Sequence, residues 1–325
     1  MSLLTYQDNL SLFDCSNFFC YYFKAMFREN KTTKEIRFRL KNRWPIVGPD
    51  HTHRYFLEEY PRFTEGKEAY IYQANDTQTL KSVAVKILPK DRLPGNSKRL
   101  ENEAYRLKKL SGQPGIPKFI DYFISQSKAH GESPTLVMEF INEESLNDKF
   151  DNNTLTKTEF IRAIIQTAEV LDILEFSFDL KPEHVKLTEP FITLVDFGEN
   201  YTKKYSAPER IRGETNITTN SFALAALTKF LLTGIGISTI GIDPQTVKTK
   251  FDELTSWNLN YIFDESDIIR MNNIFKKALS NIIEERYKSA SDFAREFAEV
   301  MKNAKGPNNS FGHKLHNIAQ RVLDP

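Results

Sequence analysis

The chain has 325 residues and carries 44 Lys and Arg against 43 Asp and Glu, a formal net charge of +1. This balance excludes a global electrostatic attraction to nucleic acid or to acidic membranes. Hydrophobic residues make up 40% of the chain and glycine only 13 positions, which excludes global disorder and collagen-like or low-complexity folds. The length suits about two domains.

Residues 1–53 differ from the rest of the chain in composition. Aromatic side chains crowd the first half of this segment, and residues 31–43 hold six basic residues and one acid. Within them Ile36, Phe38 and Leu40 alternate with basic residues, which is typical of a strand. We interpret 1–53 as an N-terminal extension that packs its aromatic side chains on the main domain. Docking to a membrane surface or to a partner protein is the alternative.

Two cysteines and two histidines in this extension raise the question of a zinc site. Cys15, Cys20, His51 and His53 are all potential ligands, but a His-x-His pair lacks the usual finger spacing, so we do not expect bound zinc. Two cysteines are also too few for a disulfide framework, which favours a reducing, cytoplasmic setting. The first residues have no basic stretch ahead of the apolar ones, so no secretory signal is expected.

Residues 54–141 are predicted to form a small, strand-rich lobe. Leu100, Ala104, Leu107 and Leu110 recur at helical spacing, and a glycine and a proline soon afterwards end that helix. The other signals are short aromatic and β-branched runs, typical of strands, at residues 55–63, 69–74, 82–88, 118–124 and 135–140.

Residues 142–304 are predicted to form a larger, helical lobe. Thr156 and Glu159 form a capping box that begins a long helix, which is expected to end near Phe176. The apolar stretch 221–242 is long enough for a membrane span, but three glycines break its second half, so we interpret it as a buried core helix. Short strand-like runs lie at 184–187 and 191–195, helices are expected at about 218–233, 244–255, 266–281 and 289–303, and a tail follows at 305–325.

Four features in a fixed order carry the chemistry. Lys86 lies in an apolar strand, Val-Ala-Val-Lys-Ile, and needs an anionic partner, which Glu103 on the following helix can supply. Each feature is common by chance, but their order and their strand and helix context are not. The remaining three are Asp179-Leu-Lys181, Asp196-Phe-Gly198 and Ala207-Pro-Glu209.

On these motifs, residues 54–304 resemble a eukaryotic-type Ser/Thr protein kinase domain. The resemblance implies an α+β, bilobal, protein-kinase-like fold with an antiparallel β-rich N-lobe at 54–141 and a larger α-helical C-lobe at 142–304. It also implies a nucleotide cleft between the lobes, with ATP and Mg²⁺ as cofactors, Mn²⁺ as the alternative ion, and a protein as the substrate.

The resemblance also implies a role for each residue nearest the chemistry. Lys86 would hold the α- and β-phosphates and Glu103 would orient Lys86. Asp196 would bind Mg²⁺. Asp179 would orient the substrate hydroxyl and accept its proton, and Lys181 would neutralise charge on the transferred phosphoryl group.

Further matched positions surround the nucleotide and the substrate. Met138 matches the gatekeeper, and Glu139 to Ile141 match the hinge, whose backbone would pair with adenine. Thr202 matches the Thr that lines the substrate site, and Arg286 matches the late Arg that forms a structural pair with the Glu of Ala-Pro-Glu. Other implied nucleotide-binding positions are Gly66, Ile71 and Ala84.

The phosphate loop departs from the family pattern. The expected Gly-x-Gly-x-x-Gly-x-Val reads Thr64-x-Gly66-x-x-Ala69-x-Ile71, so only the central glycine is kept. That glycine is where the backbone must come closest to phosphate. We therefore expect a weaker grip on the nucleotide, but not its loss.

The catalytic loop and the activation segment depart together. The family's His-Arg-Asp reads Ser177-Phe178-Asp179, and only 14 residues run from Asp196 to Glu209. The family's Arg normally pairs with a phosphorylated residue on the activation segment. Because both the Arg and most of the segment are missing, we infer that phosphorylation of this segment does not control the protein.

Two polar positions near the catalytic loop also differ from the family. His184 replaces an Asn that holds the second Mg²⁺; an imidazole suits Mn²⁺ or Zn²⁺ better. Two readings stay open, in which His184 either binds the metal or points away while one ion suffices. Asn220 replaces an Asp that anchors the catalytic loop, and it could instead cap its own helix.

Three functions are consistent with this sequence. The first is a catalytically competent serine/threonine protein kinase that does not depend on phosphorylation of its activation segment. The second is a pseudokinase that acts as a nucleotide-binding or protein-binding scaffold. The third is a kinase-fold enzyme that acts on a small molecule or a lipid. No nucleic acid partner and no transmembrane span are expected.

Overall fold

The structure is a computed structural model, and it describes residues 44–47, 53–57, 69–89, 97–127, 130–214, 216, 218–233, 262–305 and 311–312. Several predictions lie outside these residues. They concern the extension up to residue 43, the zinc site with Cys15, Cys20 and His51, the phosphate-loop residue Gly66, and the helix at 244–255.

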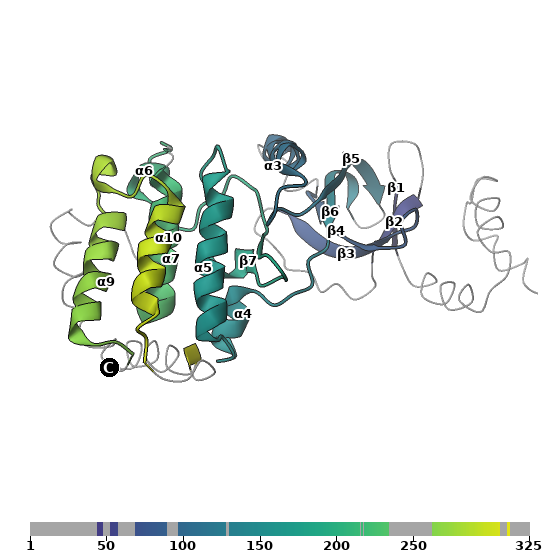
Figure 1. Ribbon diagram of the computed structural model, residues 1–325. Coiled ribbons are helices and arrows are strands. Elements are labelled where there is room, and N and C mark those ends of the chain that lie inside the picture. Colours follow the sequence, from purple (N-terminus) through teal and green to yellow (C-terminus); the bar gives the residue numbers. More distant parts are fainter. Residues whose placement is uncertain are drawn as a thin grey trace, which may run out of the picture.

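The N-lobe is a closed antiparallel sheet with one helix against it (Figure 1). Its strand order is β1-β2-β3-β4-β6-β5, and β1 closes the sheet by pairing with both β2 and β5. The helix α3 packs on β5 and β6. The bounds are β1 Trp44–Val47, β2 His53–Leu57, β3 Tyr70–Asp76, β4 Ser82–Ile87, α3 Ser97–Leu110, β5 Phe119–Ser127 and β6 Gly131–Glu139.

In strand β4, successive side chains alternate between the two faces of the sheet, and this alternation places the site. Val83, Val85 and Ile87 are buried in the core inside the closed sheet. Ala84 lies on the opposite face and belongs to a second core, which continues into the C-lobe. Lys86 shares the face of Ala84, so the strand directs its ammonium towards the junction of the lobes.

In the C-lobe, α7 and α10 lie between α5 and α9 and contact both of them, with α7 behind α10 in the view of Figure 1. Capping boxes begin α4 at Ser145 and α5 at Thr156. The bounds are α4 Leu146–Asp151, α5 Lys157–Asp172, η3 Pro182–His184, β7 Val185–Lys186, β8 Thr193–Leu194, α6 Pro208–Ile211, α7 Thr218–Thr233, α9 Glu265–Ala278, η4 Ile283–Glu285 and α10 Ala290–Met301.

The predicted α+β, bilobal fold is confirmed, with corrections to individual elements. Strand β1 lies within the segment 1–53, so the sheet includes residues on both sides of position 54. Helix α5 ends at Asp172 rather than near Phe176. The carboxylate of Asp172 accepts the backbone N–H groups of Ala290 and Ser291 and so satisfies free donors at the start of α10.

The apolar helix α7 is buried on nearly every side, as expected of a core helix. In the part of the chain that the structure describes, no helix has both the length and the apolar character needed to cross a membrane.

Candidate active site

A lysine held between two carboxylates forms the centre of the site. The Nζ atom of Lys86 lies 2.8 Å from Glu103 Oε2 and 2.8 Å from Asp196 Oδ1. Burial lowers the pKa of Lys86, but the charges of Asp196 and Glu103 outweigh burial and hold it above its ordinary value. Burial raises the pKa of Asp196, yet the charge and hydrogen bond of Lys86, together with the other neighbouring groups, bring it well below its usual range. Both groups are therefore charged at neutral pH.

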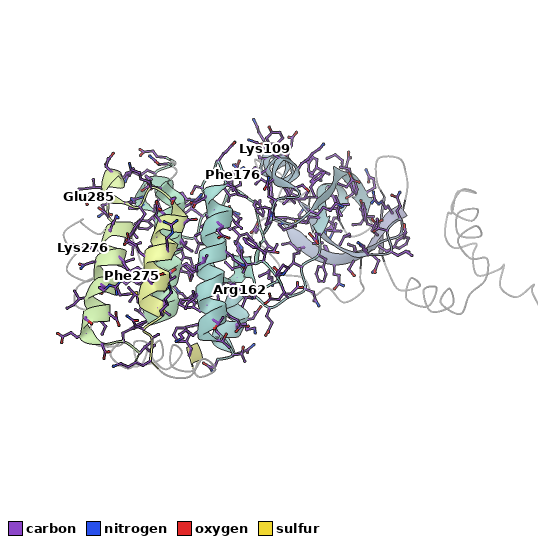
Figure 2. The ribbon with its side chains drawn as sticks, viewed as in Figure 1. Lys109, Arg162, Phe176, Phe275, Lys276 and Glu285 are labelled. Atoms are coloured by element: carbon purple, nitrogen blue, oxygen red, sulfur yellow. The ribbon has the colours of Figure 1, made fainter. Side chains whose placement is uncertain are left out.

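The segment around Asp196 is fixed by aromatic packing. The backbone of Asp196 has a φ of 70°, in the left-handed region that Asp tolerates better than most residues. The next side chain, Phe197, is buried, with its ring centroid 5.2 Å from that of Phe178 and 6.4 Å from that of Phe176. Figure 2 shows Phe176 at the edge of the helical lobe that faces α3. Because Phe197 is anchored there, the carboxylate of Asp196 is directed to Lys86.

The structure brings Asp179 and Thr202 together. The carboxylate of Asp179 accepts hydrogen bonds from the backbone N–H of Thr202 at 2.6 Å and from its hydroxyl at 3.2 Å. Lys181 lies near enough for its charge to lower the pKa of Asp196 and of His184. Three predicted site residues thus lie close together: the proton acceptor Asp179, the substrate-site Thr202 and the second lysine, Lys181.

His184 points into the site rather than away from it. Its Nδ1 lies 2.8 Å from the carbonyl oxygen of Asp179, and its Nε2 lies 3.4 Å from Asp196 Oδ2. Burial lowers the pKa of His184, so the ring is neutral at neutral pH. A carbonyl oxygen only accepts, so the proton is on Nδ1 and the lone pair of Nε2 faces Asp196.

The lone pair of His184 Nε2 and the carboxylate of Asp196 together suit a divalent cation. An imidazole nitrogen and a carboxylate oxygen converge from His184 and Asp196, a donor set that suits Mn²⁺ better than Mg²⁺. Among the described residues, no group of three or more His, Cys, Asp and Glu side chains could hold a metal ion. An ion here would therefore need further ligands from phosphates or water.

Asn220 ties the catalytic loop to the helical lobe. Its Oδ1 accepts the N–H of Phe178 at 2.9 Å, and its Nδ2 donates to the carbonyl of Phe176 at 3.0 Å. The alternative reading, that Asn220 caps its helix, is wrong, because α7 begins at Thr218 and Asn220 lies within it. The side chain satisfies loop groups from the side of the helix instead.

A buried ion pair holds the end of the activation segment. Arg286 donates to Glu209 Oε1 at 2.6 Å and to Oε2 at 3.0 Å, and Thr219 donates its hydroxyl to the same carboxylate. Both charged side chains are almost completely buried. This bidentate geometry matches the structural pair expected from the sequence.

Three of the predicted nucleotide positions, Ile71, Ala84 and Met138, lie on the face of the sheet that carries Lys86. Ile71 is directly opposite Lys86 in the β3–β4 register, and Ala84 is directly opposite Met138 in the β4–β6 register. The N–H of Glu139 donates to the carbonyl of residue 118 at 2.9 Å. Ile141 follows in the connection between the lobes.

Comparison with known proteins identifies this arrangement. The protein kinase domain family matches residues 58–303, which is most of the chain. The chain belongs to this family. The predicted resemblance to eukaryotic-type Ser/Thr protein kinases is thereby confirmed.

Individual kinases are similar to parts of the chain. The serine/threonine-protein kinases PknA of Mycobacterium tuberculosis H37Rv and of Mycobacterium bovis are each 29% identical over 162 residues, covering 47% of this chain and 37% of theirs. The chain thus matches little more than a third of the length of these relatives. The kinase domain of Mycobacterium tuberculosis PknI shares the fold, with a TM-score of 0.57, 19% identity, and coverage of 76% of this chain and 96% of that one.

This kinase domain also contains contacts that the sequence did not predict. Glu199, just after Asp196-Phe-Gly, accepts hydrogen bonds from Asn102 at 2.9 Å and from Arg106 at 3.2 Å, both on α3. The only signal was spacing: Arg106 follows Glu103 by three residues and shares its helix face. Arg210 is buried and donates to the hydroxyl of Ser177 and to a carbonyl of the activation segment. Nothing in the sequence marked it, because its burial depends on the tertiary fold.

Proposed function

We propose that this kinase domain is catalytically competent and transfers the γ-phosphoryl group of ATP to a Ser or Thr hydroxyl of a protein. One observation carries the proposal: Lys86 contacts Glu103 and Asp196 at once, each at 2.8 Å. Phosphoryl transfer consists mostly of positioning and charge stabilisation, and kinases need both the Lys–Glu ion pair and the metal-binding Asp in place. We also propose that the domain works without phosphorylation of its activation segment.

Each charged group has a part in the proposed transfer. Lys86 holds the α- and β-phosphates, and Glu103 keeps the lysine directed at them. Asp196, together with His184, would hold a divalent ion, which would supply positive charge to neutralise the phosphate oxygens. Lys181 offsets the negative charge on the group in transfer.

The hydroxyl is activated at Asp179. The oxygen of the substrate hydroxyl attacks the γ-phosphorus of ATP, and the bond from that phosphorus to the β–γ bridging oxygen breaks, which releases ADP. The proton of the hydroxyl passes to the carboxylate of Asp179. The hydrogen bonds from Thr202 at 2.6 and 3.2 Å support this role, since they orient the carboxylate. In the same proposal the nucleotide lies against Ile71, Ala84 and Met138.

Adenine would pair with the connection between the lobes. Because the N–H of Glu139 already donates to the carbonyl of residue 118, the base would use the carbonyl of Glu139 and the N–H of Ile141. Gly66 would approach the phosphates, as expected from the phosphate loop.

The preference for Ser and Thr and the cytoplasmic setting belong to the same proposal. Lys181, two residues after Asp179, is the serine/threonine-type feature of the sequence. The PknA relatives carry the name serine/threonine-protein kinase, which supports it. In this proposal the protein substrate carries a Ser or Thr hydroxyl, and nothing else about it is specified.

Transfer of label from γ-labelled ATP to a generic protein substrate tests the proposal. We expect Mg²⁺- or Mn²⁺-dependent labelling, and a decrease of about 10³-fold for Asp179→Asn, which keeps the shape but removes the base. Asp151→Asn, on the exposed end of α4, is the matched control and should label like the unmodified protein. Equal labelling by Asp179→Asn and the unmodified protein would contradict the assigned base.

The pseudokinase scaffold is the second candidate, and the loss of the flanking phosphate-loop glycines together with Phe178 favours it. A thermal melt with ATP and either ion separates the two functions, because a ligand that binds the folded state raises its apparent stability. A shift without any transfer would favour the scaffold. No shift would indicate a role in protein binding alone.

A further inference from the structure

Arg210 is a buried cation next to the catalytic loop. It is the residue after Ala-Pro-Glu, on α6, and only 8% of its surface is exposed. One terminal nitrogen, Nη1, donates to the hydroxyl of Ser177, and the other, Nη2, donates to the carbonyl oxygen of Asn200 at 2.5 Å. One guanidinium therefore connects the chain before Asp179 to the activation segment before Thr202.

The charge of Arg210 is costly unless these contacts are kept. Burial lowers the pKa of Arg210, and the negative charge of Asp179 raises it. Within the described part of the chain, no carboxylate lies close enough to form an ion pair with Arg210; its two hydrogen-bond partners are a hydroxyl and a carbonyl. Movement of the activation segment would remove one of them from a buried cation.

The residue that supplies a cation here in most of the family is absent. Phe178 occupies the Arg position of His-Arg-Asp, is 2% exposed and packs against Phe197. Its backbone N–H is held by Asn220, so the catalytic loop is fixed without a charge at that position. The positive charge comes instead from Arg210 on α6, which follows the activation segment in the chain.

We propose that Arg210 is a positioning residue, which aligns Asp179 with Thr202 by tying both of their neighbours, Ser177 and Asn200, to one buried guanidinium. This replaces the phosphate-dependent ordering of the activation segment by a permanent one. Arg210 acts through its neighbours and touches no reacting atom. The kinetic part of this inference rests on the proposed function; the structural part does not.

Amide hydrogen exchange tests the structural part in the 325-residue chain. The reporters are the N–H of Thr202, bonded to Asp179, and the N–H of Tyr205, bonded to the carbonyl of Thr202. In Arg210→Met we expect exchange in residues 199–206 to be about tenfold faster or more, since hydrogen bonds from a charged group are lost. Exchange in α5 and α10 should stay as in the unmodified protein.

Two further variants complete the test: one keeps the positive charge at position 210, and the other is a control. Arg210→Lys keeps a cation but reaches one partner, so its exchange rate should lie between those of the unmodified protein and Arg210→Met. It also keeps the inference testable if Arg210→Met does not fold. Arg212→Met, an exposed arginine at the end of the same helix, is the matched control and should change nothing.

Kinetics provides the second readout. In Arg210→Met we expect kcat to decrease by about 100-fold, because misalignment of the reacting groups has that effect. The KM for ATP should not change, because Lys86, Glu103 and Asp196 keep their contacts. If the unmodified protein transfers no phosphate, the proposed function fails but the exchange result still decides on Arg210.

Three results would overturn the inference. The first is exchange in 199–206 that stays at the rate of the unmodified protein in Arg210→Met. The second is a rise of exchange in α5, α7 and α10 of Arg210→Lys that is as large as the rise in residues 199–206, which would assign Arg210 a purely structural role. The third is a decrease in kcat accompanied by an equal rise in the KM for ATP.

Discussion

Among the single residues of the site, His184 has a direction that its sequence position leaves undetermined. The sequence identified an imidazole in place of an amide and left its direction open. The direction follows from the carbonyl of Asp179, which accepts a hydrogen bond from the Nδ1–H group and so leaves the lone pair of Nε2 facing Asp196. That carbonyl is fixed by the tertiary fold, so no sequence pattern could have predicted the direction.

The ion preference of the site should depend on this residue. We expect ATP to bind more tightly with Mn²⁺ than with Mg²⁺, and we expect His184→Asn to shift the ratio of the two affinities towards Mg²⁺ by roughly tenfold, or about 1.4 kcal/mol. Calorimetric titration with ATP and each ion measures the ratio without need of catalysis. His130→Asn, in the N-lobe hairpin, is the control. An unchanged ratio in His184→Asn would mean that the imidazole does not bind the ion.

Among the elements, α3 is held in place by two charged side chains near its middle, one helical turn apart. Leu100, Ala104 and Leu107 are buried on the face that the sequence predicted. Glu103 reaches Lys86 from that face, while Arg106 reaches Glu199 and lies over the ring of Phe176, 4.5 Å from its centroid. The helix, its buried stripe and Glu103 were predictable from spacing. The contact with Glu199 was not, because it joins residues almost one hundred positions apart.

Removal of the Glu199 carboxylate should loosen α3. We expect Glu199→Gln to raise the KM for ATP by about fivefold, because a partly exposed ion pair contributes up to about 1 kcal/mol, and Glu103 is less firmly directed at Lys86 without it. Steady-state kinetics at varied ATP measures the change. Asp292→Asn, which removes an exposed ion pair on α10, is the control. A KM that stays the same would show that α3 keeps its place without Glu199.

The buried pair between α6 and the chain after η4 should give a pH-dependent stability. Burial raises the pKa of Glu209, but the hydrogen bonds and the charge of Arg286, together with the hydrogen bonds from the backbone N–H of Glu209 itself and from Thr219, outweigh burial, and the net pKa lies below the ordinary 4.5. Its contribution to stability is therefore present above about pH 4.5 and is lost as the pH falls through the lower pKa of the folded state.

Glu209→Gln tests this pair. At pH 7 we expect a loss of about 3–5 kcal/mol in the free energy of unfolding, because Arg286 is left as an uncompensated buried charge. Urea unfolding at pH 7 and at pH 4 should show a smaller acid-induced loss in the variant than in the unmodified protein. Glu214→Gln, an exposed neighbour of α6, should behave like the unmodified protein. A parallel loss with pH in both proteins would place the acid sensitivity elsewhere.

At the scale of the whole molecule, two cores account for the two predicted lobes. Strand patterns predominate before residue 141 and helix patterns after it, so the lobes could be predicted without any motif. One core fills the closed sheet, and the other runs from Ala84 and Met138 in the N-lobe through the C-lobe to Met301. The closure of the sheet by β1 could not be predicted, because a four-residue strand carries too little pattern.

The contribution of β1 can be measured at Ile46. This residue is fully buried in the core of the closed sheet, although it lies before position 54, where we predicted the kinase domain to begin. We expect Ile46→Ala to decrease the free energy of unfolding by about 2–5 kcal/mol, through lost burial and the cavity that remains. Urea unfolding measures the loss, and Ile269→Ala, which shortens an exposed isoleucine on α9, is the matched control. If both variants were equally stable, β1 would contribute nothing to the N-lobe and the boundary at 54 would hold; a loss confined to Ile46→Ala would move the start of the domain to β1.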